Sequence, residues 1–179
     1  MTTREEILLS AQETRAMIHQ LAETVLADAT RPEKRVVVGI RRGGAVVARL
    51  LRERLNQLLD RQLPMGFLDI TFYRDDLHTI GPNPVVGATD LTMKIDDKRI
   101  ILVDDVLFTG RTIRAALNAL FDYGRPESVD LLVLVDRGGR QLPIQPDYAG
   151  RVIEAGGRES IKLVEREHGE WIVVRRWLA

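Results

Sequence analysis

The sequence contains no cysteine, which excludes disulfide bonds, thiolate metal sites and cysteine nucleophiles. It also lacks a net charge, because 26 basic residues balance 26 acidic ones, so a nucleic-acid surface would have to be a local patch. No apolar run approaches the roughly 20 residues that cross a bilayer. The N-terminal segment is too acidic for a signal peptide. We therefore expect a cytoplasmic protein with no membrane association.

What is present is the composition of an ordinary globular protein, with 45% hydrophobic and 29% charged residues. With 179 residues the chain is long enough for a core of its own, and we expect a single domain over residues 1–179. Strand and helix patterns alternate along it, which predicts an α/β fold with a parallel sheet. The expected helices cover residues 8–28, 45–59 and 113–123, and the expected strands cover residues 36–38, 65–73, 100–103, 131–135 and 152–153, before a hairpin of residues 161–164 and 171–174.

Two local signals add to this outline. Ser10 or Thr14 is expected to cap the first helix, since both are hydroxyl residues near its predicted start. Residues 74–98 form a long polar stretch, and a loop of this length inside a compact domain is usually functional or mobile.

The most informative segment is residues 100–112, which read IILVDDVLFTGRT. An apolar run ends in the adjacent carboxylates Asp104 and Asp105, where ligands of open α/β sheets bind. Ionised carboxylates accept hydrogen bonds from a vicinal diol. The turn over residues 109–112 precedes a helical pattern, and a helix N-terminus offers free amides to an anion. The order of these parts predicts a site for a sugar phosphate.

Competing phosphate-binding and acidic motifs fit this segment less well. The aspartate pair alone is compatible with an ordinary turn at the end of a strand. The sequence contains neither a P-loop motif nor the glycine pattern of a Rossmann dinucleotide site. A receiver domain would carry its acidic residues on the first strand, whereas this pair lies on a strand in the middle of the chain. The complete string favours a phosphate-binding function.

Residues 103–112 resemble the phosphoribosyl-pyrophosphate (PRPP) motif of type I phosphoribosyltransferases. Within that superfamily the chain is similar to the PyrR family of pyrimidine operon attenuation regulators that are also uracil phosphoribosyltransferases. The strings TFYRDDL at 71–77 and VDRG at 135–138 are specific to that family, whereas the last 25 or so residues resemble it weakly. The resemblance implies a mostly parallel sheet flanked by helices, with a flexible hood loop that begins at residues 73–77.

The resemblance also implies a role for each part of the site. Asp104 and Asp105 would hold the ribose hydroxyls. Arg74, in the hood loop, would bring a positive charge to the pyrophosphate. Uracil would be recognised largely through backbone groups, with the side chain of Arg137 favoured over that of Asp136. The implied site residues are Thr109, Gly110, Arg111 and Thr112 for the 5′-phosphate, Ile40, Arg41, Arg42, Gly43 and Gly44 for the pyrophosphate, and Asp136, Arg137 and Gly138 for uracil.

The implied reaction is displacement of pyrophosphate from C1 of PRPP by N1 of uracil, which gives UMP. Mg²⁺ would be bound with PRPP rather than by protein side chains alone. The sequence shows no obvious general base, and a loose transition state needs none if positioning and charge stabilisation supply the acceleration. Homodimers or higher homo-oligomers are implied as well.

Binding of pyr leader mRNA is the second activity that the resemblance implies, and here the sequence departs from the family pattern. Gly139 replaces a histidine, and Glu23 lies in a helix that is richer in arginine in RNA-binding members. The remaining candidates for phosphate contacts are Arg15, His19, Arg140 and Arg151. Two alternatives therefore stay open, namely an RNA-binding regulator with little enzymatic role and a purine phosphoribosyltransferase.

Overall fold

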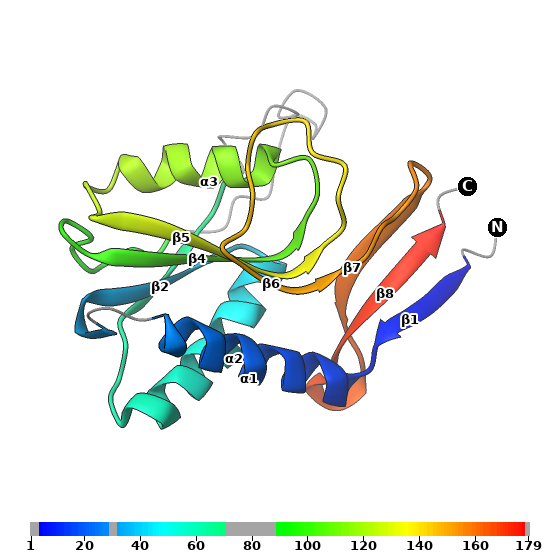
Figure 1. Cartoon of the computed structure of the whole chain (residues 1–179), viewed down its shortest axis with the longest axis horizontal. Helices are drawn as coiled ribbons and strands as arrows, with labels where there is room; N and C mark the ends of the chain where they lie inside the picture. Colours follow the sequence, from blue (N-terminus) through cyan, green and yellow to red (C-terminus); the bar gives the residue numbers. More distant parts are fainter. Residues whose placement is uncertain (1–3, 29–31, 71–88, 178–179) are drawn as a thin grey trace.

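The computed structural model describes residues 4–28, 32–70 and 89–177. Its centre is a five-stranded parallel sheet in the order β3-β2-β4-β5-β6 (Figure 1). The α/β fold class predicted from the sequence is therefore confirmed. The strands are β2 (Arg35–Ile40), β3 (Met65–Leu68), β4 (Arg99–Leu107), β5 (Ser128–Asp136) and β6 (Tyr148–Val152).

Helices cover both faces of this sheet. Helices α1 (Ala11–Ala27) and α2 (Gly43–Leu59) lie on one face, and α3 (Arg111–Phe121) lies on the other (Figure 1). Each face has its own hydrophobic cluster, with Ile101 and Val103 of β4 in the first and Ile100 and Leu102 in the second. Successive side chains of a strand point to opposite faces, so the continuous apolar run of residues 100–103 is what a strand buried on both sides requires.

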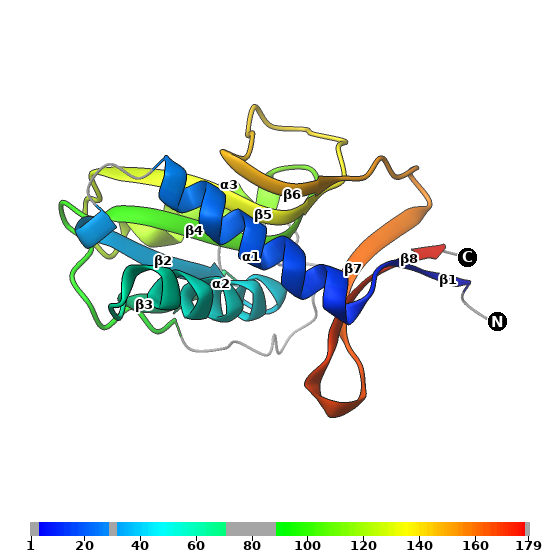
Figure 2. The ribbon, with the colours of Figure 1, turned by 60° about the horizontal axis from the view of Figure 1, so that its bottom comes forward.

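A second, antiparallel sheet lies beside the carboxyl ends of the parallel strands (Figures 1 and 2). We call it the small sheet. It consists of β1 (Glu5–Leu9), β8 (Trp171–Trp177) and β7 (Glu159–Glu165), in that order. Short 3₁₀ helices lie at Pro32–Lys34 and Glu167–Gly169, the latter between β7 and β8. The hairpin of β7 and β8 matches the prediction, but β1 was not predicted.

The first helix shows why β1 was missed. The helix begins at Ala11 rather than at residue 8, because Ser10 caps it. The amide of Glu13 donates to Ser10 Oγ at 3.3 Å, and the amide of Ser10 donates to Glu13 Oε2 at 2.8 Å, which forms a complete capping box. The apolar residues that precede the cap belong to a strand whose partner, β8, lies at the other end of the sequence.

Strand boundaries differ from the predictions at three places. Strand β4 continues to Leu107, so the two aspartates lie inside the strand rather than after it. Strand β3 ends at Leu68, and residues 71–73 of the predicted strand lie outside the described residues. The last parallel strand, β6, runs over Tyr148–Val152 rather than residues 152–153, because it pairs with β5 from Leu132 onwards. In the part of the chain that the structure describes, no helix has the length and apolar character needed to span a bilayer.

Candidate active site

The aspartate pair of β4 lies near the carboxyl end of the central strand. Asp104 is 5% exposed, and the amide of Asp105 donates to its Oδ1 at 3.0 Å. Burial raises the pKa of the Asp104 carboxyl well above its usual range, and the neighbouring charge of Asp105 raises it further. Asp105 is partly exposed. The pair therefore combines a buried carboxyl that resists ionisation with a carboxylate that is open to a ligand.

The first turn of α2 packs directly against this pair. A Cβ atom on Gly43 would lie 2.2 Å from Asp105 Oδ2, a distance that no side chain tolerates. The contact arises because β2 and β4 are adjacent parallel strands, with Gly39 in register with Val103. The two segments that were predicted to bind the ribose and the pyrophosphate of PRPP therefore lie side by side.

The rest of the predicted pyrophosphate loop, Ile40 to Gly44, crosses from β2 to α2 at the same edge. The amide of Arg41 donates to Leu68 O at 2.9 Å, which attaches the loop to the end of β3. The Arg41 guanidinium lies over the ring of Phe67, 5.6 Å from its centroid, and the peptide bond between Arg41 and Arg42 is cis. Arg42 is exposed.

The predicted phosphate turn, Thr109 to Thr112, connects β4 to α3. Gly110 is the N-cap residue of α3, and the amide of Arg111 donates to Thr109 Oγ1 at 3.3 Å. The carbonyl of Thr109 accepts hydrogen bonds from the amides of Gln141 and Leu142 at 3.0 and 3.2 Å. The turn is thus fixed from outside, and it opens α3, whose N-terminal end favours an anion through the helix dipole.

The predicted uracil segment, residues 136–138, lies beside the PRPP turn because β5 pairs with β4. Asp136 is in register with Leu107, and the amide of Arg137 donates to Leu107 O at 3.0 Å. Partial burial opposes ionisation of Asp136, but hydrogen bonds from Arg140 and from the Gly138 amide outweigh it, so its pKa is lowered. These bonds are 2.6 Å from Arg140 Nη2 and 2.9 Å from Gly138 N.

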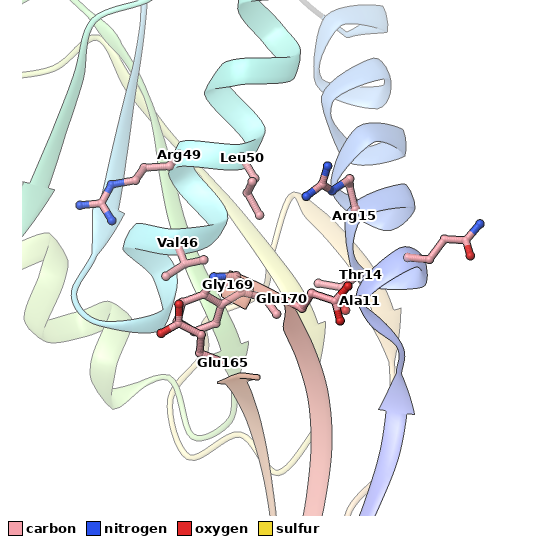
Figure 3. A pocket seen from close by; sticks show the side chains of 11 residues that line it. Ala11, Thr14, Arg15, Val46, Arg49, Leu50, Glu165, Gly169 and Glu170 are labelled. Carbon is pink, nitrogen blue, oxygen red and sulfur yellow. The ribbon is translucent and has the colours of Figure 1, made fainter. Parts of the chain in front are cut away.

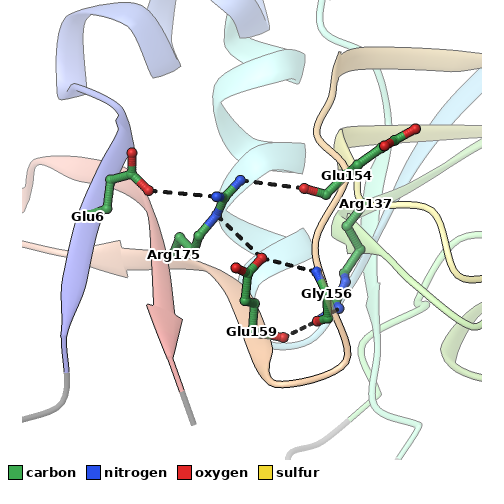
Figure 4. A network of polar contacts seen from close by, with 6 residues as sticks. All are labelled: Glu6, Arg137, Glu154, Gly156, Glu159 and Arg175. Atoms are coloured by element: carbon green, nitrogen blue, oxygen red, sulfur yellow. Dashed lines mark hydrogen bonds and ion pairs between the residues drawn. The ribbon is translucent and has the colours of Figure 1, made fainter.

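The side chain of Arg137 connects this segment to the small sheet. It is 7% exposed, and its Nη1 and Nη2 donate to the carbonyls of Glu159 and Gly156 at 3.1 and 3.3 Å. Its guanidinium lies 3.8 Å from the centroid of the Phe108 ring. Figure 4 shows how the contacts continue through Glu159 into the small sheet, where Arg175 lies 3.8 Å from carboxylate oxygens of both Glu159 and Glu6.

Phe108 is the residue that the sequence interpretation missed. It stands between the aspartate pair and the phosphate turn, and it is 41% exposed although it is a large apolar residue. An aromatic side chain directly before the polar turn of residues 109–112 is a signal that was available in the sequence.

The four residues predicted to contact RNA do not all lie on one element of the described structure. Arg140 is directed into the candidate active site, where it donates to Asp136 and to the carbonyls of Phe108 and Ile144. Arg151 donates to Leu8 O at 3.2 Å. His19 is half-buried on α1. Arg74 and the hood loop of residues 73–77 lie outside the described residues.

Arg15 lines a separate cavity of about 650 Å³ between α1, α2 and the segment from β7 to β8 (Figure 3). Arg49, Trp171 and Thr14 also line the cavity, but its lining includes none of the residues predicted to bind PRPP. Within the described residues, no three histidine, aspartate or glutamate side chains form a group that would hold a metal ion.

Comparison with known proteins identifies the family. The sequence model of the phosphoribosyl transferase domain family matches residues 4–164 of this chain. The chain is 43% identical to the bifunctional protein PyrR of Actinobacillus pleuropneumoniae serotype 5b over 159 residues, which are 89% of each protein. It is 41% identical to the bifunctional protein PyrR of Deinococcus radiodurans, over 93% of this chain and 91% of that protein.

Solved structures agree with the fold. A hypoxanthine phosphoribosyltransferase from Trypanosoma cruzi superimposes with a TM-score of 0.71 at 21% identity, covering 97% of this chain and 96% of that one. A hypoxanthine-guanine phosphoribosyltransferase from Bacillus anthracis gives a TM-score of 0.67 at 21% identity, covering 86% of each chain. At this level of identity the similarity concerns the fold alone. Together with the geometry of the aspartate pair and its two adjoining turns, the sequence relatives show that this chain belongs to the PyrR family of the phosphoribosyl transferase fold.

Proposed function

We propose that this chain is a uracil phosphoribosyltransferase, which forms UMP and pyrophosphate from uracil and PRPP. The observation that carries the proposal is the meeting of three segments around the end of β4. The glycine turn that opens α2 packs on Asp105, and the phosphate turn that opens α3 follows the aspartates within the same strand-to-helix connection. This arrangement occurs in a chain that is 41–47% identical to PyrR proteins.

In this proposal the aspartate pair holds the ribose ring. Asp105, being partly exposed, accepts hydrogen bonds from the 2′- and 3′-hydroxyls together with Asp104. The 5′-phosphate binds over the N-terminus of α3, where Thr109, Thr112 and backbone amides supply donors and Arg111 supplies charge. The sugar is then held at both ends, which orients C1 toward the uracil segment.

The diphosphate of PRPP binds at the turn from Ile40 to Gly44. The arginines Arg41 and Arg42 supply positive charge there, and the missing side chain of Gly43 leaves room for the Asp105 carboxylate beside the turn. The adjacent carboxylates and this open turn fit a Mg²⁺ ion that retains water and takes phosphate oxygens. Such an ion, bound with PRPP, supplies charge neutralisation for the leaving diphosphate.

The base binds beside residues 136–138. Uracil presents two carbonyls and two N–H groups at its edges, and backbone amides and carbonyls complement such a pattern. Both terminal nitrogens of Arg137 donate to backbone carbonyls of the connection into β7, so we assign base recognition to the backbone rather than to this side chain. The C1–O bond to the diphosphate breaks as the bond to N1 forms, and the N1 proton leaves to solvent or to the diphosphate. We retain Arg74, outside the described residues, as the charge that closure would bring to the diphosphate.

RNA binding is the second candidate function, and membership of a family of bifunctional proteins favours it. Arg15 of α1 lines the cavity between α1 and α2, whereas the guanidinium of Arg49 lies over the Phe67 ring, 4.8 Å from its centroid. The opposing observation is that Glu23 binds Arg54 at 2.8 Å on the same pair of helices, which neutralises one positive charge. A gel shift with the leader RNA at low and high salt tests this function, and a complete lack of binding at low salt would exclude it.

Measurement of UMP, GMP and IMP formation from PRPP and each free base tests the enzymatic proposal. We expect turnover with uracil in the presence of Mg²⁺ and no turnover with guanine or hypoxanthine. Activity restricted to the purines would replace the proposal with that of a purine phosphoribosyltransferase. Absence of turnover with all three bases, together with tight RNA binding, would favour a regulator with little enzymatic role.

A further inference from the structure

The ring of Phe108 is held in a defined position although 41% of the residue is exposed. Isolated exposed apolar residues are common and need no explanation. Phe108 differs because three neighbours constrain it. The guanidinium of Arg137 lies 3.8 Å from its centroid, and its carbonyl accepts a hydrogen bond from Arg140 Nη1 at 3.0 Å. The third neighbour is Gly139, whose hydrogen-only side chain leaves space for the ring.

The contact with Gly139 is close. A Cβ atom at position 139 would lie 2.6 Å from Cε2 of Phe108, so the ring fills the space where a side chain would otherwise stand. The backbone of Gly139 has φ of 76°, in the left-handed region. Phe108 therefore touches the uracil segment on both sides of Gly138, through Arg137 and through Gly139.

The guanidinium that covers the ring is itself immobilised. Arg137 is anchored by the carbonyls of Gly156 and Glu159, at the start of the small sheet. A cation close to the face of an aromatic ring is attracted by the ring's quadrupole, and the attraction is stronger where water is excluded, as around a residue that is 7% exposed. The small sheet, Arg137 and Phe108 thus form one connected support.

We infer that Phe108 is the apolar contact of the pyrimidine base and determines how tightly uracil binds. The inference rests on the proposed function. A base joined to C1 of a ribose that Asp104 and Asp105 hold must lie between those carboxylates and residues 136–138. Phe108 follows Asp105 by three residues in the chain and contacts Arg137 and Gly139, so its ring borders the segment proposed to recognise uracil. The polar edge of uracil finds backbone donors and acceptors, and its ring face requires an apolar surface, which Phe108 provides.

The test is steady-state kinetics of Phe108→Ala and Phe108→Leu, with uracil and PRPP varied separately. Loss of the ring should raise KM for uracil about tenfold, since contacts between a base and an aromatic side chain contribute on this scale. KM for PRPP should change less than about twofold, because the PRPP ligands remain in place. Phe108→Leu keeps an apolar side chain of intermediate size and should fall between the two proteins.

Phe121→Ala is the matched control, because Phe121 is 43% exposed at the last residue of α3 and takes no part in the proposed site. It should leave both KM values unchanged. If Phe108→Ala folds and keeps the wild-type KM for uracil, the inference is overturned. The proposed function would still stand in that case, because the wild-type protein would form UMP from uracil and PRPP. If the wild-type protein has no uracil activity, the proposed function fails and this inference fails with it. If Phe108→Ala does not fold, Phe108→Leu decides, because an unchanged KM for uracil there would equally overturn it.

Discussion

Gly43 lies so close to Asp105 that a Cβ atom would stand 2.2 Å from Oδ2 of the carboxylate. The two residues belong to different elements: Gly43 is the first residue of α2, and Asp105 lies near the end of β4. Their contact brings the turn that we propose for the pyrophosphate to the aspartates that we propose for the ribose. It also makes the identity of residue 43 a condition for the geometry of the site.

We predict that Gly43→Ala lowers kcat/KM for PRPP about a hundredfold, because the methyl group must push Asp105 or the turn aside by an ångström or so. Gly157→Ala is the control, since a Cβ atom there meets nothing within 4 Å. The control should retain full activity. Equal kinetics for the two variants would show that the turn and the carboxylate are not functionally coupled.

Replacement of each aspartate by asparagine should lower turnover without preventing folding. Asp104→Asn and Asp105→Asn should each lower turnover about a hundredfold, because each replaces a carboxyl oxygen with an amide nitrogen that cannot accept a hydrogen bond from a sugar hydroxyl. Both variants should fold, as judged by circular dichroism. Near wild-type rates in both would show that the diol is bound elsewhere.

The raised pKa of Asp104 predicts a pH-dependent gain of stability in Asp104→Asn. A carboxyl whose pKa is higher in the folded state stabilises the fold fully below its unfolded pKa of about 3.9, and this contribution is lost as the pH rises through the folded value. Asp104→Asn has no ionisable group at this position, so its stability does not fall as the pH rises through that value. In urea titrations without ligand, its stability relative to the wild type should therefore increase from pH 4 upward. A difference that is constant with pH would contradict the burial of an ionisable Asp104.

Arg137→Gln should destabilise the protein and loosen the small sheet. The substitution removes two hydrogen bonds from a charged donor and leaves the carbonyls of Gly156 and Glu159 without their partner, which should lower the free energy of unfolding by about 2 kcal/mol. Hydrogen exchange should accelerate in β7 more than in β4. Arg158→Gln, at an exposed position, is the control and should change neither measurement.

The neighbours Gly138 and Gly139 allow the steric effect of Phe108 to be isolated. Both have positive φ, 70° and 76°, so an alanine at either position should destabilise the fold by roughly 1–2 kcal/mol through its backbone. Only at position 139 would the methyl group also collide with the Phe108 ring. Gly139→Ala should therefore be the more damaging, and Phe108→Ala in the same chain should remove the difference. A difference that persists in the double variant would show that the ring is not its cause.

Much of the site could be predicted from the sequence, because its parts are contiguous. Asp104, Asp105 and the turn at Thr109 lie within a few residues of one another, and an apolar strand followed by a helix pattern is enough to place them at a sheet edge. The parallel sheet was predictable for the same reason, since β4 and β5 are continuous apolar runs.

Contacts between distant segments were not predictable. The register that sets Leu107 beside Asp136 determines that Arg137 covers Phe108, and no local pattern contains that register. Residues 8 and 9 of β1 were included in the predicted first helix and residues 5–7 in no element, because the strand character of this segment depends on β8. The prediction that favoured the Arg137 side chain over that of Asp136 could not include the carbonyls of Gly156 and Glu159, which come from a distant segment and accept hydrogen bonds from Arg137.

The pairing of β1 with β8 has a consequence for the order of folding. Glu5 is in register with Arg176, so this part of the small sheet joins residues that are 171 positions apart. A contact of such sequence separation closes a very large loop and forms late. During synthesis, the aspartate pair and both phosphate turns leave the ribosome well before β8 does. We therefore expect the segments proposed to bind PRPP to be available to a folding chain before β8 can complete the small sheet on which Arg137 is anchored.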